Sequence, residues 1–162
     1  MDLDAACADA FGQQQQNNHP PQQALQQPEV EFEYTGKGCQ IPKNVTIVRF
    51  HPSVVEVEDG AFRDCKQLRK VVFNDGLQKI GRGAFWCCTS LSSITLPSTV
   101  TEIEQFAFGN CRNLREVIFN NGLQKIGSGA FCNCSSLQSI ALPSTLVEIG
   151  SNAFLLCRNE IC

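Results

Sequence analysis

The chain has 162 residues, 43% of them hydrophobic and 18% charged, which is enough for one domain or a short repeat array but not for a multidomain enzyme. Its 13 Lys and Arg stand against 16 Asp and Glu and give a formal net charge of -3, which argues against the basic surface that binds nucleic acid. The sequence contains no run of about 18 apolar residues, so no membrane-spanning helix is expected.

Residues 1–28 differ in composition from the rest of the chain. They include the run Gln13–Gln16 and a series of Asn, Pro and Gln residues that ends at Pro28. Such a segment cannot bury enough apolar surface to offset the entropy lost on ordering it. The sequence therefore predicts a disordered Gln/Pro-rich tail over 1–28, which serves either as a neutral leader or as a weak interaction arm.

The start of the chain lacks the charge pattern of an export signal. Asp2 and Asp4 stand where a secretory signal peptide carries Lys or Arg. We therefore expect an intracellular, cytoplasmic protein, in a reducing compartment where disulfides do not persist.

Residues 29–43 are predicted to form an N-terminal capping strand. Val30, Phe32 and Tyr34 alternate with three glutamates, the pattern of a strand with one buried face. Repeat arrays need such a cap, because the first coil otherwise exposes its hydrophobic cross-section. We expect this strand to lie over the first coil.

The rest of the chain repeats with a period of 23 residues. The repeat is marked by Phe62, Phe85, Phe108, Phe131 and Phe154. An Ala precedes each of these Phe residues, and a Cys follows three positions later. Each coil reads L-x-x-[IV]-x-[LF], a turn, [VL]-x-x-[IV], and then A-F-x-x-C, so that Val71 and Phe73, for example, point inward together along a short strand.

One such coil cannot bury its own apolar edge, so successive coils must stack. Over 44–157 the sequence predicts a repeat solenoid: a curved array of five coils with stacked parallel β-strands, a central column of Phe side chains, and a short helical turn at each A-F-x-x-C. Residues 158–162 begin a further coil that stays incomplete.

A longer period of 46 residues is superimposed on the first. Asn74-Asp75-Gly76 recurs as Asn120-Asn121-Gly122, and Pro97-Ser98-Thr99 recurs as Pro143-Ser144-Thr145. Both sequences make tight turns, one through a permissive Gly and the other through the fixed φ of Pro. The alternation indicates duplication of a two-coil unit.

These repeats resemble the leucine-rich repeats, and among them the BspA-like type known from surface antigens. The segment 137–157 matches L-x-x-I-x-L-P-x-x-[LV]-x-x-I-G-x-x-A-F-x-x-C at every fixed position. The resemblance covers about 44–157 and implies a leucine-rich repeat fold. It also implies adhesion, partner recognition or scaffolding, since the repeat motif of this family carries no catalytic residue.

No catalytic, cofactor or metal site is predicted. The ladder of Cys65, Cys88, Cys111, Cys134 and Cys157 occupies inward positions, where a free Cys acts as a small hydrophobe. Structural zinc sites use two C-x-x-C pairs, which this chain lacks. His19 lies in the tail and His51 in a turn, and no nucleophile is spaced to pair with either.

The outward positions of the strands are the candidate site for a protein or peptide partner. The residues predicted to contact it are Arg69, Lys70, Ser92, Thr95, Arg115, Glu116 and Gln138. Arg69 and Arg115 stand two coils apart and either frame a shallow site for an acidic or polar peptide, through bidentate bonds to carboxylates, or are solvated rim residues.

The sequence thus predicts a non-enzymatic protein-interaction scaffold. The alternative is a structural, self-associating or adhesion-type module. It is motivated by 158–162, which leave the last coil without a closing cap and so expose its strand edge and apolar section to end-to-end association.

Overall fold

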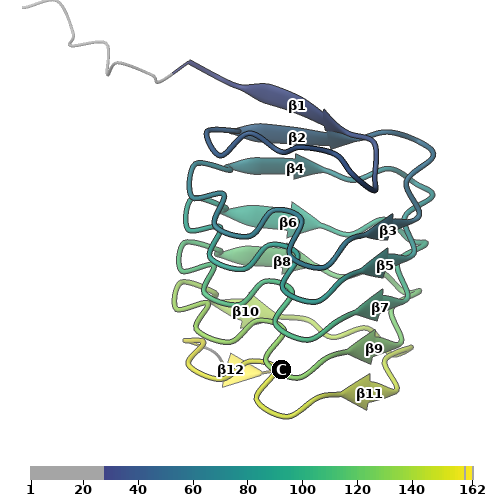
Figure 1. Ribbon diagram of the computed structural model, residues 1–162. Helices are drawn as coiled ribbons and strands as arrows, with labels where there is room; N and C mark the ends of the chain where they lie inside the picture. The colour runs from purple at the N-terminus through teal and green to yellow at the C-terminus, as the bar shows by residue number, and fades with distance from the viewer. Residues whose placement is uncertain (1–27, 159, 162) are drawn as a thin grey trace, which may run out of the picture.

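The computed structural model describes residues 28–158 and 160–161, so the prediction for the tail at 1–28 lies outside the described residues except for Pro28. The chain winds into a solenoid with two rows of short strands (Figure 1). The first row consists of β1 (Glu31–Tyr34), β2 (Ile47–Phe50), β4 (Lys70–Val72), β6 (Ser93–Thr95), β8 (Glu116–Ile118), β10 (Ser139–Ile140) and β12 (Glu160–Ile161). The second consists of β3 (Glu56–Val57), β5 (Lys79–Ile80), β7 (Glu102–Ile103), β9 (Lys125–Ile126) and β11 (Glu148–Ile149).

Every strand pair is parallel, and the register follows the 23-residue period. Val48 pairs with Val71 in the first row, and Ile80 pairs with Ile103 in the second. The second row is one continuous five-stranded sheet, whereas the first is divided into β1-β2-β4, β6-β8 and β10-β12. This arrangement confirms the repeat solenoid of stacked parallel strands.

Two details of the expected fold are wrong. The solenoid makes about four turns, not five coils, and the described residues contain no helix. In the A-F-x-x-C segments that have a following coil, the N–H groups alternate between local and cross-coil acceptors: Cys88 donates to the Phe85 carbonyl at 3.2 Å, while Phe85 itself donates to the Ala107 carbonyl of the next coil at 2.7 Å. Because every second N–H is committed to a neighbouring coil, the segment forms a turn instead of a helix.

The core is a column of stacked rings. The centroids of Phe62, Phe85, Phe108 and Phe131 follow one another at 4.9, 5.1 and 5.3 Å with nearly parallel planes. These four side chains have no exposed surface. The spacing approximates the 4.7–4.9 Å between neighbouring strands, since each ring advances with its own coil.

The first strand lies over the top of this column. β1 pairs in parallel with β2, so that Tyr34 stands opposite Phe50. The Tyr34 ring packs 5.0 Å from the Phe50 ring and 5.1 Å from Phe62, and its hydroxyl accepts the N–H of Glu58 at 3.3 Å. Burial raises the pKa of this phenol. At the other end, β12 pairs with β10 through Ser139–Glu160 and Ile140–Ile161.

The cysteine ladder satisfies backbone carbonyls between coils. The thiols of Cys88, Cys111 and Cys134 each donate to the carbonyl of the Phe in the preceding coil at 3.2 Å. All three are fully buried, which confirms their inward position. The Cys is therefore a small apolar side chain that also supplies a weak hydrogen bond to a buried acceptor.

The 46-residue alternation corresponds to two ways of linking neighbouring coils. In one, the side-chain amide of Asn74 donates to the His51 carbonyl at 2.6 Å and to the Val54 carbonyl at 2.9 Å, while its oxygen accepts the Gly76 N–H. In the other, the Thr99 hydroxyl donates to the Leu77 carbonyl at 2.6 Å. Asn120 and Thr145 repeat these two arrangements.

Candidate functional site

The second row of strands carries a ladder of alternating charges. Glu56, Lys79, Glu102, Lys125 and Glu148 occupy equivalent positions in β3, β5, β7, β9 and β11. Lys79 pairs with Glu56 at 3.5 Å and with Glu104, and Lys125 pairs with Glu102 and Glu148 at 3.5 and 3.6 Å. We call this surface the ladder face. The hydrogen bond with Glu104 raises the pKa of Lys79.

The predicted contact residues lie along the first row, which we call the strand face. Lys70 and Glu116 begin β4 and β8, and Thr95 ends β6. The other four residues occupy equivalent positions, each one residue before a strand. They are Arg69 before β4, Ser92 before β6, Arg115 before β8 and Gln138 before β10. All seven side chains are exposed.

Backbone hydrogen bonds hold part of this set together. The Arg115 N–H donates to the Ser92 carbonyl at 2.8 Å, and the Gln138 N–H donates to the Arg115 carbonyl at 3.4 Å. Arg69 belongs to the other side of a break in the row, since β4 and β6 lie in different sheets. Its N–H donates instead to the Thr46 carbonyl at 2.8 Å.

The charged residues among the seven predicted contact residues differ from those of the ladder face in having no ion-pair partner within 28–158, although Arg49 and Glu31 at the start of the same row do pair, at 3.5 Å. Within 28–158, none of Arg69, Lys70, Arg115 and Glu116 is part of an ion pair. Each of the two ladder lysines, by contrast, contacts two glutamates. The strand face therefore retains charge that a partner can neutralise.

A groove marks the break between β4 and β6. It has a volume of about 260 Å³ and is lined by Val71, Val72, Phe73, Asp75, Thr95, Leu96 and Pro97. Of these, only Thr95 is among the predicted contact residues. The sequence does differ between the two coils that border this groove: Phe73-Asn74 follows β4, whereas Leu96-Pro97 follows β6. From the sequence alone this difference predicts only two kinds of turn.

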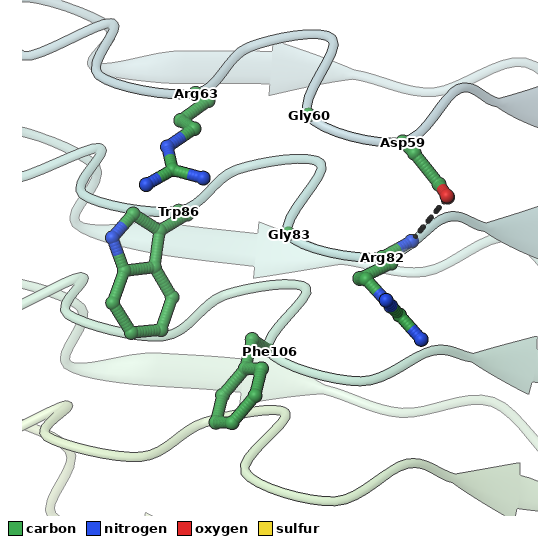
Figure 2. Close-up of a pocket in the computed structure, with 7 residues that line it drawn as sticks. All are labelled: Asp59, Gly60, Arg63, Arg82, Gly83, Trp86 and Phe106. Carbon is green, nitrogen blue, oxygen red and sulfur yellow. Dashed lines mark hydrogen bonds between the residues drawn. The ribbon is translucent and has the colours of Figure 1, made fainter.

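A second pocket lies on the A-F-x-x-C turns, where the sequence predicted no site. It has a volume of about 360 Å³ and is lined by Asp59, Gly60, Arg63, Arg82, Gly83, Trp86 and Phe106. Figure 2 shows Arg63 and Trp86 on one side, Asp59 and Arg82 on the other, and Phe106 in the coil below. We call it the turn pocket.

The two aromatic rings of the turn pocket meet edge to face. Their centroids lie 5.5 Å apart with an interplanar angle of 87°, a favourable geometry for aromatic pairs. Each ring also lies over a glycine of the next coil. A Cβ built at Gly109 would come within 2.3 Å of the Trp86 ring, and one at Gly129 within 2.3 Å of the Phe106 ring.

Phe106 has an unusual backbone conformation. Its φ is +57°, in the left-handed region. The equivalent positions in other coils are Gly60, Gly83, Gly129 and Asn152, with φ of +65°, +57°, +63° and +59°. A bulky residue at such an angle is rare and strained. The substitution of Phe for Gly within a regular repeat was the sequence signal that could have located this pocket.

The fully buried ladder thiols Cys88 and Cys111 are poor candidates for reactive groups, whereas a hydrogen bond with Cys134 lowers the pKa of the half-buried Cys157. Burial raises the pKa of Cys88 and raises that of Cys111 to about 12. Cys87 and Cys132, outside the ladder, are half-buried, and burial raises the pKa of each as well. A thiolate, the reactive form, is therefore disfavoured at the four positions where burial raises the pKa.

The chain matches one family model and several solved structures. The model is the BspA type leucine rich repeat region, in six copies over 36–160. A leucine rich repeat protein of T. pallidum is 36% identical with a TM-score of 0.67, over 70% of this chain and 55% of its own. One of Bacteroides ovatus is 31% identical with a TM-score of 0.63, over 73% of this chain and 30% of its own. A leucine rich cell surface protein of Faecalibacterium prausnitzii is 30% identical with a TM-score of 0.57, over 70% of this chain and 37% of its own.

The chain thus spans about half the length of the first of these proteins and about a third of the other two. No protein with a curated description matches it. The described part of the chain has no helix with the length and apolarity to cross a membrane.

Proposed function

Because the chain belongs to the BspA-type leucine-rich repeat family, we propose that it is a non-enzymatic scaffold that binds a protein or peptide partner on its strand face. The contact residues are those predicted from the sequence: Arg69, Lys70, Ser92, Thr95, Arg115, Glu116 and Gln138. Repeat folds of this kind present extended binding surfaces on a rigid backbone.

The observation that carries the proposal is the difference between the two charged faces. Lys79 and Lys125 are each held between glutamates, so a partner would have to displace an existing pair. Arg69, Lys70 and Arg115 have no such partner within 28–158, and their side chains are exposed. Binding there gains a charge interaction without breaking one.

The charges also indicate what the partner carries. The seven predicted contact residues include three cations and one carboxylate, Glu116, so this part of the strand face is basic on balance, and arginine binds carboxylates in a bidentate geometry. An acidic segment is therefore the expected ligand. The groove lined by Phe73 and Leu96 lies between the coils of Arg69 and Ser92 and would accept an apolar side chain of the same segment.

Selection from a random peptide library tests this function. Peptides captured by the chain should be rich in Asp and Glu. They should bind the double variant Arg69→Ala/Arg115→Ala about tenfold or more weakly, as expected when two exposed charge contacts are lost. The matched control is Lys66→Ala/Arg112→Ala, which removes the same charge from exposed turn positions. Equal binding by the two double variants would exclude the strand face.

A second candidate function, self-association, is supported by the surface of the last coil. Val57, Ile80, Ile103 and Ile126 have no exposed surface, whereas the equivalent Ile149 is 49% exposed. Val147, Leu155 and Leu156 are exposed beside it. Apolar surface of this kind favours association, and light-scattering mass measured across a range of concentrations tests it. A mass that stays at one chain would exclude this function.

A further inference from the structure

We propose that the turn pocket binds the C-terminal residue of a peptide that ends in an apolar side chain. The apolar side chain contacts Trp86 and Phe106, and the terminal carboxylate contacts Arg63 and Arg82. This site shares no residue with the strand face, so the proposal goes beyond the function proposed above and can fail or succeed independently of it.

The size of the turn pocket limits its ligand. Its volume of about 360 Å³ lies at the low end of the range for ligand sites. An extended segment would exceed this volume, whereas one residue with its carboxylate fits. The apolar group and the anionic group of the ligand must therefore belong to the same residue or to adjacent residues.

The aromatic rings of the turn pocket are partly exposed and lie outside the buried core. The rings of the Phe column have no exposed surface, while Phe106 is 38% exposed and Trp86 is only half-buried. Figure 2 shows the Arg63 side chain next to the Trp86 ring, and Arg82 on the opposite side of the pocket from both rings. Covering them with an apolar group removes this surface from water, which favours binding.

Both rings pack against the next coil before any ligand arrives. Trp86 and Phe106 lie over Gly109 and Gly129, whose missing side chains leave the space that the rings occupy. The Phe106 backbone is held at a left-handed φ that other coils give to Gly or Asn. A site whose side chains are already positioned loses less entropy on binding.

The residues that line the turn pocket carry one net positive charge. The pocket has two guanidinium groups and one carboxylate. That carboxylate is engaged, because Asp59 Oδ1 accepts the backbone N–H of Arg82 at 2.7 Å. Within the described chain the Arg82 side chain is in no ion pair, and Arg63 contacts only its exposed neighbour Asp64, at 3.7 Å. Arginine binds carboxylates through bidentate hydrogen bonds.

A chain terminus supplies the required combination most directly. The α-carboxylate of a terminal residue is bonded directly to the Cα that bears its side chain, so both groups reach a small pocket together. An internal acidic residue would instead require the chain to continue on both sides of the pocket. These considerations favour an apolar C-terminal residue over an internal acidic segment.

The fluorescence of Trp86 tests the proposal directly, since it is the sole tryptophan of the chain. Acetyl-Gly-Phe with a free carboxylate should change this fluorescence saturably, with half-saturation at about 1 mM for a ligand of this size. The C-terminal amide of the same peptide should bind at least about tenfold more weakly. Equal binding of the two forms, or no saturable change, would overturn the proposal. Phenylacetate binding as tightly as the peptide would also overturn it, in favour of a small aromatic acid.

Variants distinguish the turn pocket from the rest of the surface. Arg63→Gln and Arg82→Gln should each weaken the carboxylate peptide by about threefold to tenfold and leave the amide unchanged. Phe106→Gly should abolish the saturable change while the fold persists, because the backbone angle at this position suits Gly. Arg112→Gln, an exposed control, and Arg69→Ala/Arg115→Ala should bind as the unmodified chain does. Loss of binding in either control, or retention in Phe106→Gly, would overturn the assignment.

Discussion

The ring of Phe108 lies between those of Phe85 and Phe131, and its plane makes an angle of 0° with that of Phe85 at a centroid separation of 5.1 Å. Phe108→Ala removes a fully buried ring with stacked neighbours on both sides. The free energy of unfolding should fall by about 3–5 kcal/mol and the Tm by about 10 °C. Calorimetry measures both. Phe154→Ala, at a partly buried ring with one stacked neighbour, should cost less, and a Tm change below about 2 °C for Phe108→Ala would contradict its place in the column.

The backbone angle of Phe106 predicts an order of stability among variants. Phe106→Ala keeps the left-handed φ at a residue with a Cβ, whereas Phe106→Gly relieves it. Both lose the same aromatic contact. The Gly variant should therefore be more stable than the Ala variant by about 1 kcal/mol, although Ala is usually the more stable of the two. Urea denaturation of both variants measures the difference, and an Ala variant of equal stability would show that the angle is unstrained.

Two glycines in tight places should respond differently to substitution by alanine. A Cβ at Gly109 meets the far end of the Trp86 side chain, which can move, whereas a Cβ at Gly81 meets the backbone carbonyl of Val57 at 2.4 Å. Gly109→Ala should shift the Trp86 emission to the red with little loss of stability. Gly81→Ala should leave the emission largely in place but lower the Tm more. If Gly109→Ala lowered the Tm more than Gly81→Ala, the Trp86 ring would be held in place more firmly than the backbone of neighbouring coils.

The buried thiols predict a loss of stability at alkaline pH. Burial raises the pKa of Cys111 to about 12 in the folded chain, while the unfolded thiol titrates near 9. Between these values the unfolded chain binds fewer protons than the folded one, so the free energy of unfolding falls as pH rises, by up to about 1.4 kcal/mol per pH unit for this thiol. Below about pH 8.5 its contribution is constant.

The measurement is urea denaturation between pH 8 and 11 under reducing conditions. Cys111→Ala should show a shallower decline than the unmodified chain. Tyr34 and Lys79, whose pKa values are also raised, contribute equally to both proteins and cancel in the comparison. Identical slopes would mean that Cys111 is accessible to water in the folded state.

The ladder face predicts how copies of the chain interact. Head-to-tail stacking in register would bring Glu148 of β11 against Glu56 of β3 in the next copy, a repulsive pair. Glu148→Lys would continue the alternation and pair with Glu56, so light-scattering mass should rise with concentration more steeply than for the unmodified chain, and added salt should reduce the effect. Glu116→Lys, the same charge change at an exposed position of β8 in the middle of the array, is the control. No difference between the two variants would exclude this mode of stacking.

The periodicity of the sequence was sufficient to predict the solenoid. Phe62 through Phe131 must lie in one register, because an apolar residue every 23 positions can be buried only by stacking coils. The helical turns were predicted wrongly, because a small-large-small spacing such as Ala84, Phe85 and Cys88 suits both a helix and a turn. What decides between them is the destination of the Phe85 N–H, which depends on the neighbouring coil.

The strand face could be predicted because outward positions follow from the alternation of side chains in a strand. The turn pocket could not, since it depends on where the Trp86 ring turns after leaving the backbone. That direction is set by Gly109, 23 residues away. The break between β4 and β6 was likewise hidden, because Val71 and Ile94 follow the same pattern as residues whose strands do pair.

Two features alternate from coil to coil: the side chain that links neighbouring coils, Asn or Thr, and the charge on the ladder face. Both limit how the number of coils can change. Removing a single coil would preserve the Phe column but would set Glu beside Glu or Lys beside Lys on the ladder face. It would also place Asn74 and Asn120, or Thr99 and Thr145, in adjacent coils. Removing or adding two coils at once preserves both the alternation of charge and the alternation of linking arrangements. The unit that can be gained or lost without penalty is therefore the pair of coils, and length variants of this chain should differ in steps of 46 residues.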